Sequence, residues 1–496
     1  MSKTGFDNEK YIALQSQNIR QRREQFGDKL YLEFGGKLFD DYHASRVLPG
    51  FAPDSKLKML LKLKDQAEIV IVINSDAIEK NKKRGDLGIG YDQDVLRLID
   101  IFREIGLYVG SVVITCFNNQ PSAINFEKRL KALGINVYRH YIIEDYPANV
   151  PLIVSDEGFG KNDYIETTRS LVVVTAPGPG SGKMAACLSQ LYHEHKRGIK
   201  AGYAKFETFP VWNLPLSHPV NLAYEAATAD LADVNMIDPY HLEAYGSMAV
   251  NYNRDVEVFP VLRSMLTGIL GECPYKSPTD MGVNMAGFCI YDDEAVCDAA
   301  GQEILRRHYN ALCNMRKGSD NQEEIDKIEL LMRKIGITAE LNRKCVPAAL
   351  RRAEETGAPA VAIELDDGRI VTGKTSSLLG ASSAALLNAL KLVAGIDDEL
   401  EVISPEVIEP IQKLKTEYLG NHNPRLHTDE VLVALSVSAV NNPLARRAFE
   451  AIPGLKYAEV HSTVILSQVD AATFRKLGAN LSCEPQYQTK KLFHNS

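Results

Sequence analysis

The stretch Leu171-Val-Val-Val-Thr-Ala-Pro-Gly-Pro-Gly-Ser-Gly-Lys-Met184 decides the fold prediction. Its first five residues are apolar or β-branched, a pattern typical of a strand buried on both faces. A glycine-rich turn follows, and the segment 185–192 then has the composition of an apolar helix. The order of strand, glycine turn and helix indicates a P-loop-like turn at the edge of an α/β sheet.

The glycine turn predicts a phosphate site built mainly from backbone groups. Glycines allow successive N–H groups to approach phosphate oxygens closely. The N-terminus of the following helix adds a partial positive charge. We therefore expect the phosphate to bind at Gly178, Gly180, Ser181, Gly182 and Lys183. Lys183 is also a candidate catalytic residue, because its side chain can reach the terminal phosphates.

Two positions differ from the phosphate-loop pattern G-x-x-x-x-G-K-[ST]. Pro177 occupies the place of the first glycine, and Met184 occupies the place of the hydroxyl residue that ligates Mg²⁺. Because methionine has no hydroxyl, the sequence argues against ordinary Mg²⁺-dependent ATP hydrolysis. Binding of ATP or another phosphorylated compound is compatible with the change. A tight turn without any ligand is the structural alternative.

Strands and helices alternate on both sides of this stretch, which predicts a mainly parallel sheet. A hairpin is also expected near the N-terminus, with Leu30–Phe34 and Lys37–Phe39 joined by Gly35-Gly36. The other predicted segments are a helix over 8–27, strands over 68–74, 109–116 and 137–143, and helices over 93–105 and 123–133.

Three regions follow from the changes in periodicity. Residues 1–220 are predicted to form the N-terminal α/β domain that carries the glycine loop. Residues 221–335 have mostly helical spacing and are predicted to form a helical subdomain. Residues 336–496 return to mixed α/β character, with Asp366-Asp-Gly368 as a hairpin turn.

Several polar residues outside the loop are candidates for completing a site. In the stretch Ser155–Asn162, two glycines and Lys161 could clamp an anion, and Asp156 or Glu157 could act as a base. Lys205 could line the same cleft. Asp76 follows a predicted strand and could face Mg²⁺ at the carboxyl edge of the sheet. Each has a plain alternative: a solvent loop for Ser155–Asn162, a solvated charge for Lys205, and a helix N-cap at Ser75-Asp76.

The C-terminal region offers a weaker candidate at Lys374, in Gly373-Lys374-Thr375. This tripeptide imitates the end of a phosphate loop, but helix capping by Ser376 or Ser377 explains the hydroxyls equally well. His461 is expected to be a core histidine. No metal site is predicted: His193-Glu194-His195 is not the zinc motif H-E-x-x-H, because neighbouring residues of a helix point in different directions.

Composition restricts the class of protein. The chain has 496 residues, a net charge of −8 and eight scattered cysteines. We expect a cytoplasmic protein with reduced thiols, without a nucleic-acid partner and without a membrane segment. The expected partner is a small phosphorylated molecule, and assembly into a homo-oligomer is left open.

Three strings of the sequence resemble a known bacterial family. They are Thr175–Met184, Lys205-Phe-Glu-Thr-Phe-Pro-Val-Trp-Asn213 and Val464-Ile-Leu-Ser-Gln-Val-Asp470. The chain is identified by them as a member of uncharacterised protein family 371, or domain of unknown function 1846. The resemblance implies a C-terminal domain similar to the three-layer cytidine-deaminase-like fold, without its zinc motif. It implies no catalytic residue.

The sequence therefore supports a leading hypothesis and two alternatives. The leading hypothesis is a phosphate- or nucleotide-binding enzyme of small-molecule metabolism that uses the glycine loop. The first alternative is a non-catalytic sensor or binding protein for a phosphorylated metabolite. The second is a purely structural loop, with the function near Lys374.

Overall fold

The computed structural model describes residues 4–35, 38–39, 41–84, 88–231 and 233–488, and these form two compact units. The larger unit consists of Thr4–Glu225 and Asp233–Cys297. The described part of the smaller unit consists of 226–231 and 298–488. The predicted helical subdomain, 221–335, therefore contributes residues to both units. The division into three domains stays a prediction.

The larger unit is built on a seven-stranded sheet in the order β4-β3-β2-β5-β1-β6-β9, with every pair parallel. The apolar runs predicted as strands form its centre, and β5 lies between β2 and β1. The strands are β1 (Lys29–Phe34), β2 (Ala67–Asn74), β3 (Tyr108–Phe117), β4 (Asn136–Tyr141), β5 (Leu171–Thr175), β6 (Ala201–Phe206) and β9 (Gly282–Val283).

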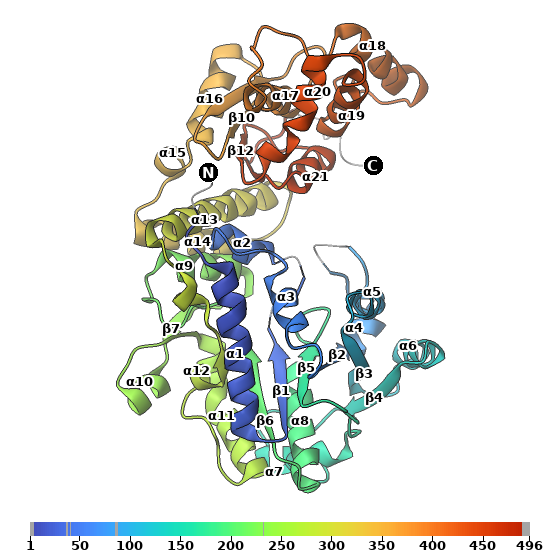
Figure 1. Ribbon diagram of the computed structural model, residues 1–496, viewed down its shortest axis with the longest axis vertical. Helices are drawn as coiled ribbons and strands as arrows, with labels where there is room; N and C mark the ends of the chain where they lie inside the picture. Colours follow the sequence, from blue (N-terminus) through green and yellow to red (C-terminus); the bar gives the residue numbers. More distant parts are fainter. Residues whose placement is uncertain (1–3, 36–37, 40, 85–87, 232, 489–496) are drawn as a thin grey trace. The chain divides into compact units, whose positions relative to one another are not determined.

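Helices cover both faces of this sheet (Figure 1). The helix predicted over 8–27 is α1 (Asn8–Phe26), which begins after Asp7, whose side chain accepts a hydrogen bond from the Lys10 N–H. The other helical elements that begin in this unit are α2 (Tyr42–Val47), α3 (Ser55–Leu61), α4 (Ser75–Glu79), α5 (Tyr91–Glu104), α6 (Pro121–Ala132), α7 (Val150–Ile153), η1 (Phe159–Lys161), α8 (Lys183–Lys196), α9 (Pro219–Ala227), α10 (Pro239–Tyr245), α11 (Asn253–Leu270), α12 (Pro278–Met281) and η3 (Ala286–Cys289). A small antiparallel sheet pairs β7 (Asn235–Ile237) with β8 (Val250–Tyr252).

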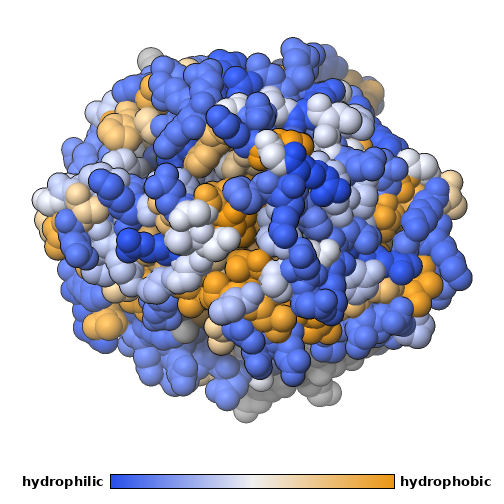
Figure 2. Space-filling view, turned by 90° about the horizontal axis from the view of Figure 1, so that it is seen from below, coloured by the Kyte–Doolittle hydropathy of each residue, from blue (hydrophilic) through white to orange (hydrophobic). Residues whose placement is uncertain are grey.

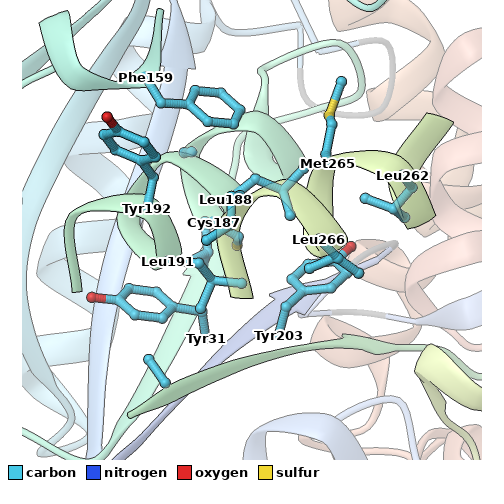
Figure 3. Close-up of a cluster of buried hydrophobic side chains, with 14 of the residues drawn as sticks. Tyr31, Phe159, Cys187, Leu188, Leu191, Tyr192, Tyr203, Leu262, Met265 and Leu266 are labelled. Atoms are coloured by element: carbon cyan, nitrogen blue, oxygen red, sulfur yellow. The ribbon is translucent and has the colours of Figure 1, made fainter. Parts of the chain in front are cut away.

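The main core of the larger unit lies between the sheet and the helices α8 and α11. Tyr31 and Tyr203 project from β1 and β6, and Cys187, Leu191 and Leu266 meet them from the two helices (Figure 3). Because side chains alternate along a strand, the residue two positions after Tyr31 points to the same face. That residue is Glu33.

The predicted hairpin near the N-terminus is wrong. Residues Leu30–Phe34 do form a strand, but β1 pairs in parallel with β5 and β6. Leu38 and Phe39 form a bend, and Lys37 lies outside the described residues. The pattern misled because a strand in the middle of a sheet, with all its side chains buried, shows no preference for a partner near in sequence.

The smaller unit contains a four-stranded mixed sheet in the order β11-β10-β12-β13. The expected hairpin at Asp366–Gly368 is confirmed, because β10 and β11 are antiparallel and Gly368 has a φ of 81°. The strands are β10 (Ala360–Glu364), β11 (Ile370–Lys374), β12 (Glu459–Ser462) and β13 (Asn480–Cys483).

Helices surround this second sheet and supply most of its core. Helix α13 (Asp293–Arg316) begins in the larger unit. The others are η2 (Ala229–Leu231), α14 (Gln322–Ile335), α15 (Ala339–Asn342), α16 (Cys345–Thr356), α17 (Ala381–Val393), α18 (Pro405–Lys413), η4 (Leu414–Tyr418), α19 (Thr428–Ser438), α20 (Pro443–Glu450), η5 (Ile452–Leu455) and α21 (Gln468–Lys476).

The protein is thus an α/β protein with one large parallel sheet and one smaller mixed sheet. Among the described residues, none of the helices combines the length and apolar character needed to cross a membrane. The face shown in Figure 2 is mostly hydrophilic, and its hydrophobic side chains gather mainly near the centre.

Candidate functional site

The glycine loop lies at the carboxyl edge of the large sheet, between β5 and α8. From β2 the chain continues to β3, towards the β4 edge of the sheet. From β5 it continues to β6, towards the β9 edge. The connections therefore diverge at the boundary between β2 and β5. Open α/β sheets commonly bind ligands in the crevice at such a switch point.

Four carbonyl groups of the loop accept hydrogen bonds from the protein itself. Asn74, at the end of β2, and Thr115, near the end of β3, each donate to a loop carbonyl, so the neighbouring strands fix the loop. The hydrogen bonds are Ser181 Oγ to Gly178 O (2.8 Å), Asn74 Nδ2 to Gly180 O (3.3 Å), Thr115 Oγ1 to Ser181 O (2.8 Å) and Ala186 N to Gly182 O (3.0 Å).

The N–H groups of the same loop, unlike its carbonyl groups, have no hydrogen-bond partner among the described residues. None of the consecutive N–H groups from Gly180 to Ala185 donates a hydrogen bond to any residue that the structure describes. No side chain caps the first turn of α8. A segment with satisfied carbonyls and free amides presents positive partial charge, which suits an anion.

Lys183 adds a full positive charge to these amides. It is the first residue of α8, is half-buried, and forms no hydrogen bond or ion pair within the described part of the chain. Burial raises the pKa of the nearby Cys187 thiol well above its ordinary value, Glu33 raises it further and Lys183 lowers it. Lys183 and Glu33 therefore both lie close to the first turns of α8.

Two glycines of the loop are required by its geometry. A Cβ at Gly178 would come within 2.2 Å of the Tyr91 hydroxyl oxygen, so no larger residue fits without movement. Gly182 has a φ of 83°, in the left-handed region that side chains disfavour. A Cβ there would also lie 3.2 Å from Thr115 Oγ1.

A pocket of about 330 Å³ opens beside the loop. It includes Asp76, which the sequence suggested as an acid at the carboxyl edge, and the exposed Lys80 and Lys82. Asp76 and Lys80 are 3.9 Å apart. The other lining residues are Asn74, Ala77, Pro179, Gly180 and Ser181.

The alternative role of Asp76 as a helix cap is wrong. The N-cap of α4 is Asn74, whose Oδ1 accepts a hydrogen bond of 2.8 Å from the Asp76 N–H. Asp76 occupies the first helical turn, and its side chain is 58% exposed. The carboxylate is therefore available to a ligand or cation in the pocket.

Lys205 lies farther from the loop, on β6, two strands from β5. Its ammonium group contacts Tyr252 Oη at 2.9 Å, Glu207 Oε1 at 2.8 Å and a carboxylate oxygen of Asp255. Burial raises the pKa of Glu207 to about 7, and Asp255 also raises it, whereas Lys205 lowers it. Because three acceptors surround Lys205, its charge is already compensated within the protein.

Asp156 and Lys161 are not brought to the glycine loop. Asp156 accepts a hydrogen bond of 2.5 Å from Tyr192 Oη and lies 3.2 Å from Lys196 Nζ, at the last turns of α8. Lys183 is thirteen residues before Lys196, which corresponds to about 20 Å of helix. Lys161 forms an exposed ion pair of 2.6 Å with Glu157.

The residues around Lys374 form an ordinary turn. Lys374 is exposed at the end of β11. The predicted capping by Ser376 or Ser377 is wrong, because the N-cap of α17 is Gly380. Ser376 Oγ instead accepts hydrogen bonds from the N–H groups of Leu378 and Leu379.

In the segment His193-Glu194-His195, the first two residues have different hydrogen-bond partners. His193 Nε2 contacts the carbonyl of Asn162 at 2.8 Å, whereas Glu194 Oε1 lies 2.8 Å from Lys29 Nζ. His461 is fully buried in β12, and its pKa is lowered by burial.

His218, Asp293 and Cys297 form a compact group with metal-ligand chemistry. His218 Nε2 lies 3.0 Å from Asp293 Oδ1 and 3.6 Å from Cys297 Sγ. However, Nδ1 accepts a hydrogen bond from the Val220 N–H. In a neutral ring the proton must then lie on Nε2, facing the other two groups, which leaves no lone pair for a metal.

Sequence reasoning missed Asn74 and Thr115, whose side chains donate hydrogen bonds to the loop carbonyls. Both are polar residues at the ends of apolar strands. That position is the available signal, because the carboxyl ends of parallel strands meet at one edge of the sheet.

The fold is that of an α/β protein with a large parallel sheet, and the glycine loop lies at a switch point of this sheet. The chain matches the family models described as "Domain of unknown function DUF1846, N-terminal" over residues 4–336 and "Domain of unknown function DUF1846, C-terminal" over residues 341–493. The chain belongs to this family.

Full-length relatives carry the name UPF0371 protein. One from Streptococcus thermophilus is 58% identical over 493 residues, which are 99% of this chain and all of the relative. One from Corynebacterium efficiens is 59% identical over 492 residues, 99% of each chain. One from Streptococcus pneumoniae is 57% identical over 493 residues, covering 99% of this chain and all of the relative. These names state no activity.

Proposed function

We propose that this protein is a phosphate- or nucleotide-binding enzyme of small-molecule metabolism and that the glycine loop holds the phosphate. The observation that carries the proposal is the run of N–H groups from Gly180 to Ala185 that have no acceptor among the described residues. The run includes Lys183, whose side chain has no hydrogen-bond or ion-pair partner within the same residues. Such a run at a helix N-terminus suits a phosphate, because every amide and the helix dipole favour negative charge.

The roles of the individual residues follow from this arrangement. The amides and the Lys183 ammonium neutralise the phosphate, and the pocket lined by Asp76, Lys80 and Lys82 receives an adjoining part of the ligand. The P-loop-like character of the turn belongs to this proposal. The cytidine-deaminase-like topology of the C-terminal region stays a prediction.

A non-catalytic sensor of a phosphorylated metabolite is the second candidate. Met184 favours it, because the position after the loop lysine lacks the hydroxyl that usually ligates Mg²⁺. Turnover separates the two candidates, since a sensor binds the ligand without consuming it.

A thermal-shift screen tests the proposal. Wild type and Lys183→Ala are heated with inorganic phosphate, pyrophosphate, nucleotides and sugar phosphates, with and without Mg²⁺. A ligand that binds the native state raises its melting temperature. We expect at least one of these compounds to raise it for wild type and to lose the effect in Lys183→Ala.

The matched control is Lys196→Ala, which removes an exposed lysine from the opposite end of the same helix. It should retain the wild-type shift. A shift that survives Lys183→Ala, or no shift with any of these compounds, rejects the glycine loop as the phosphate site.

A further inference from the structure

Glu33 is a buried carboxylate beside the glycine loop. It lies on β1, in register with Val174 of β5. Side chains in register on parallel strands point to the same face, and Val174 packs in the core beneath α8. Glu33 is only 9% exposed, and its charge raises the pKa of the thiol of Cys187, which lies on α8.

The two oxygens of this carboxylate differ. Oε2 accepts a hydrogen bond of 2.7 Å from Tyr203 Oη, which comes from the neighbouring strand β6. Oε1 accepts none from the residues that the structure describes. Lys205 is in register with Glu33 on β6, yet its ammonium contacts Asp255, Glu207 and Tyr252 instead. Glu33 therefore keeps one oxygen unused.

A carboxylate in this place opposes a purely binding role for the loop. Two unit charges of like sign repel each other, and burial strengthens the repulsion. Glu194 is neutralised by a direct ion pair with Lys29 at 2.8 Å, and the buried Glu68 accepts hydrogen bonds from the N–H groups of Thr168 and Arg169. Among the described residues, Glu33 has neither an ion pair nor a backbone donor. Glu33 has the buried position and the unused oxygen of a group that accepts a proton.

We propose that Glu33 is the general base of the glycine-loop site and that the reaction transfers a phosphoryl group to a hydroxyl acceptor. The inference rests on the proposed function and assigns its reaction class. The acceptor oxygen forms a bond to phosphorus while its proton passes to Glu33 Oε1. The bond from phosphorus to the leaving oxygen breaks, and its electron pair stays on that oxygen. Tyr203 is a positioning residue, because it holds the other carboxylate oxygen.

The test compares binding with turnover in Glu33→Gln. Water serves as the acceptor, ATP and pyrophosphate serve as donors with and without Mg²⁺, and phosphate release is measured beside the thermal shift. The substitution removes the proton acceptor but keeps the shape of the side chain. We expect the ligand-induced shift to be retained or larger, and phosphate release to fall about 10²-fold or more.

Glu157→Gln is the control, because Glu157 is an exposed carboxylate near the far end of α8. It should bind and release phosphate as wild type does. Tyr203→Phe should lower the rate of release by a smaller factor than Glu33→Gln while the shift is retained.

The two proposals fail in different ways. If Lys183→Ala leaves the shift unchanged, the proposed phosphate site is wrong. If Lys183→Ala abolishes the shift but Glu33→Gln releases phosphate at the wild-type rate, the phosphate site stands and Glu33 is not the base. Binding by wild type without any phosphate release also overturns the inference, and it supports the sensor.

Discussion

Gly182 joins the strand and helix that form the site, and its conformation is unfavourable for other residues. Its φ of 83° places the Ser181 carbonyl towards Thr115 and leaves the following amides free. A side chain in the left-handed region costs about 1 kcal/mol or more. The stability of the loop and the proposed phosphate site therefore both depend on the geometry of this single residue.

Gly182→Ala tests that connection. We expect the free energy of unfolding to fall by roughly 1 to 2 kcal/mol and the phosphate-dependent thermal shift to be lost. Gly106→Ala is the matched control, because Gly106 has a similar φ of 81° and no other atom lies within 4 Å of the position of an added Cβ. It should lose similar stability in urea unfolding but keep the ligand shift. Equal ligand shifts in both variants would show that the loop conformation is irrelevant to binding.

Glu207 makes the second prediction at the residue scale. Burial raises its pKa to about 7 in the folded protein, from the ordinary value of 4.5. The native state thus holds a proton that the unfolded chain has released between these values. The contribution of this proton to the free energy of unfolding is complete below pH 4.5 and is lost as the pH rises towards 7.

Urea unfolding of wild type and Glu207→Gln at pH 5, 6 and 7 measures this effect. The free energy of unfolding of wild type relative to the variant should decrease as the pH rises. A difference that is constant or increases over this range contradicts the raised pKa of Glu207.

At the scale of elements, the loop depends on the strands beside its own. The Thr115 hydroxyl on β3 donates a hydrogen bond of 2.8 Å to the Ser181 carbonyl, and this bond turns the carbonyl away from the free amides. Thr115→Val keeps the shape but removes the donor. We expect a loss of about 1 kcal/mol of stability and a weaker affinity for phosphate, measured by calorimetric titration.

Thr267→Val serves as the matched control, because the Thr267 hydroxyl donates only to the Arg263 carbonyl within the exposed part of α11. Its phosphate affinity should equal that of wild type. Wild-type affinity in Thr115→Val would mean that the carbonyl orientation does not matter.

The sequence predicted the elements of the larger unit well, because their signals are local. Apolar runs such as Glu68–Asn74 and the helix over 8–27 appear as β2 and α1. Strand pairing was not local, so β1 was mistaken for half of a hairpin. Glu33 was missed for the same reason, since its role depends on β5 as a neighbour. The place of Lys183 at the start of α8 was predictable because the loop is continuous in sequence, and its role in phosphate binding stays a prediction.

At the scale of the whole molecule, the two units have separate cores. Arg343 is fully buried in the smaller unit and donates to Ser482 Oγ at 2.9 Å and to the Val460 carbonyl at 2.9 Å. It also pairs with Glu459. Arg343→Ala removes the donor from these buried acceptors, which costs about 1 to 3 kcal/mol, whereas Glu459 keeps its ion pair with Arg306 at 2.6 Å.

Calorimetry of Arg343→Ala tests this separation. We expect an unfolding transition at lower temperature for the smaller unit, while the phosphate ligand still stabilises the larger unit as in wild type. Loss of the ligand-induced stabilisation in this variant would show that the site requires the smaller unit.

In the proposed function, the amides of the glycine loop bind phosphate. The most direct test is an NMR titration of protein labelled with [¹⁵N]glycine, with the resonance of Gly180 assigned by its loss in Gly180→Ala. Inorganic phosphate or pyrophosphate should shift the Gly180 amide proton in wild type, and the shift should be absent in Lys183→Ala. A Gly180 resonance that stays in place while other glycines respond would contradict the claim.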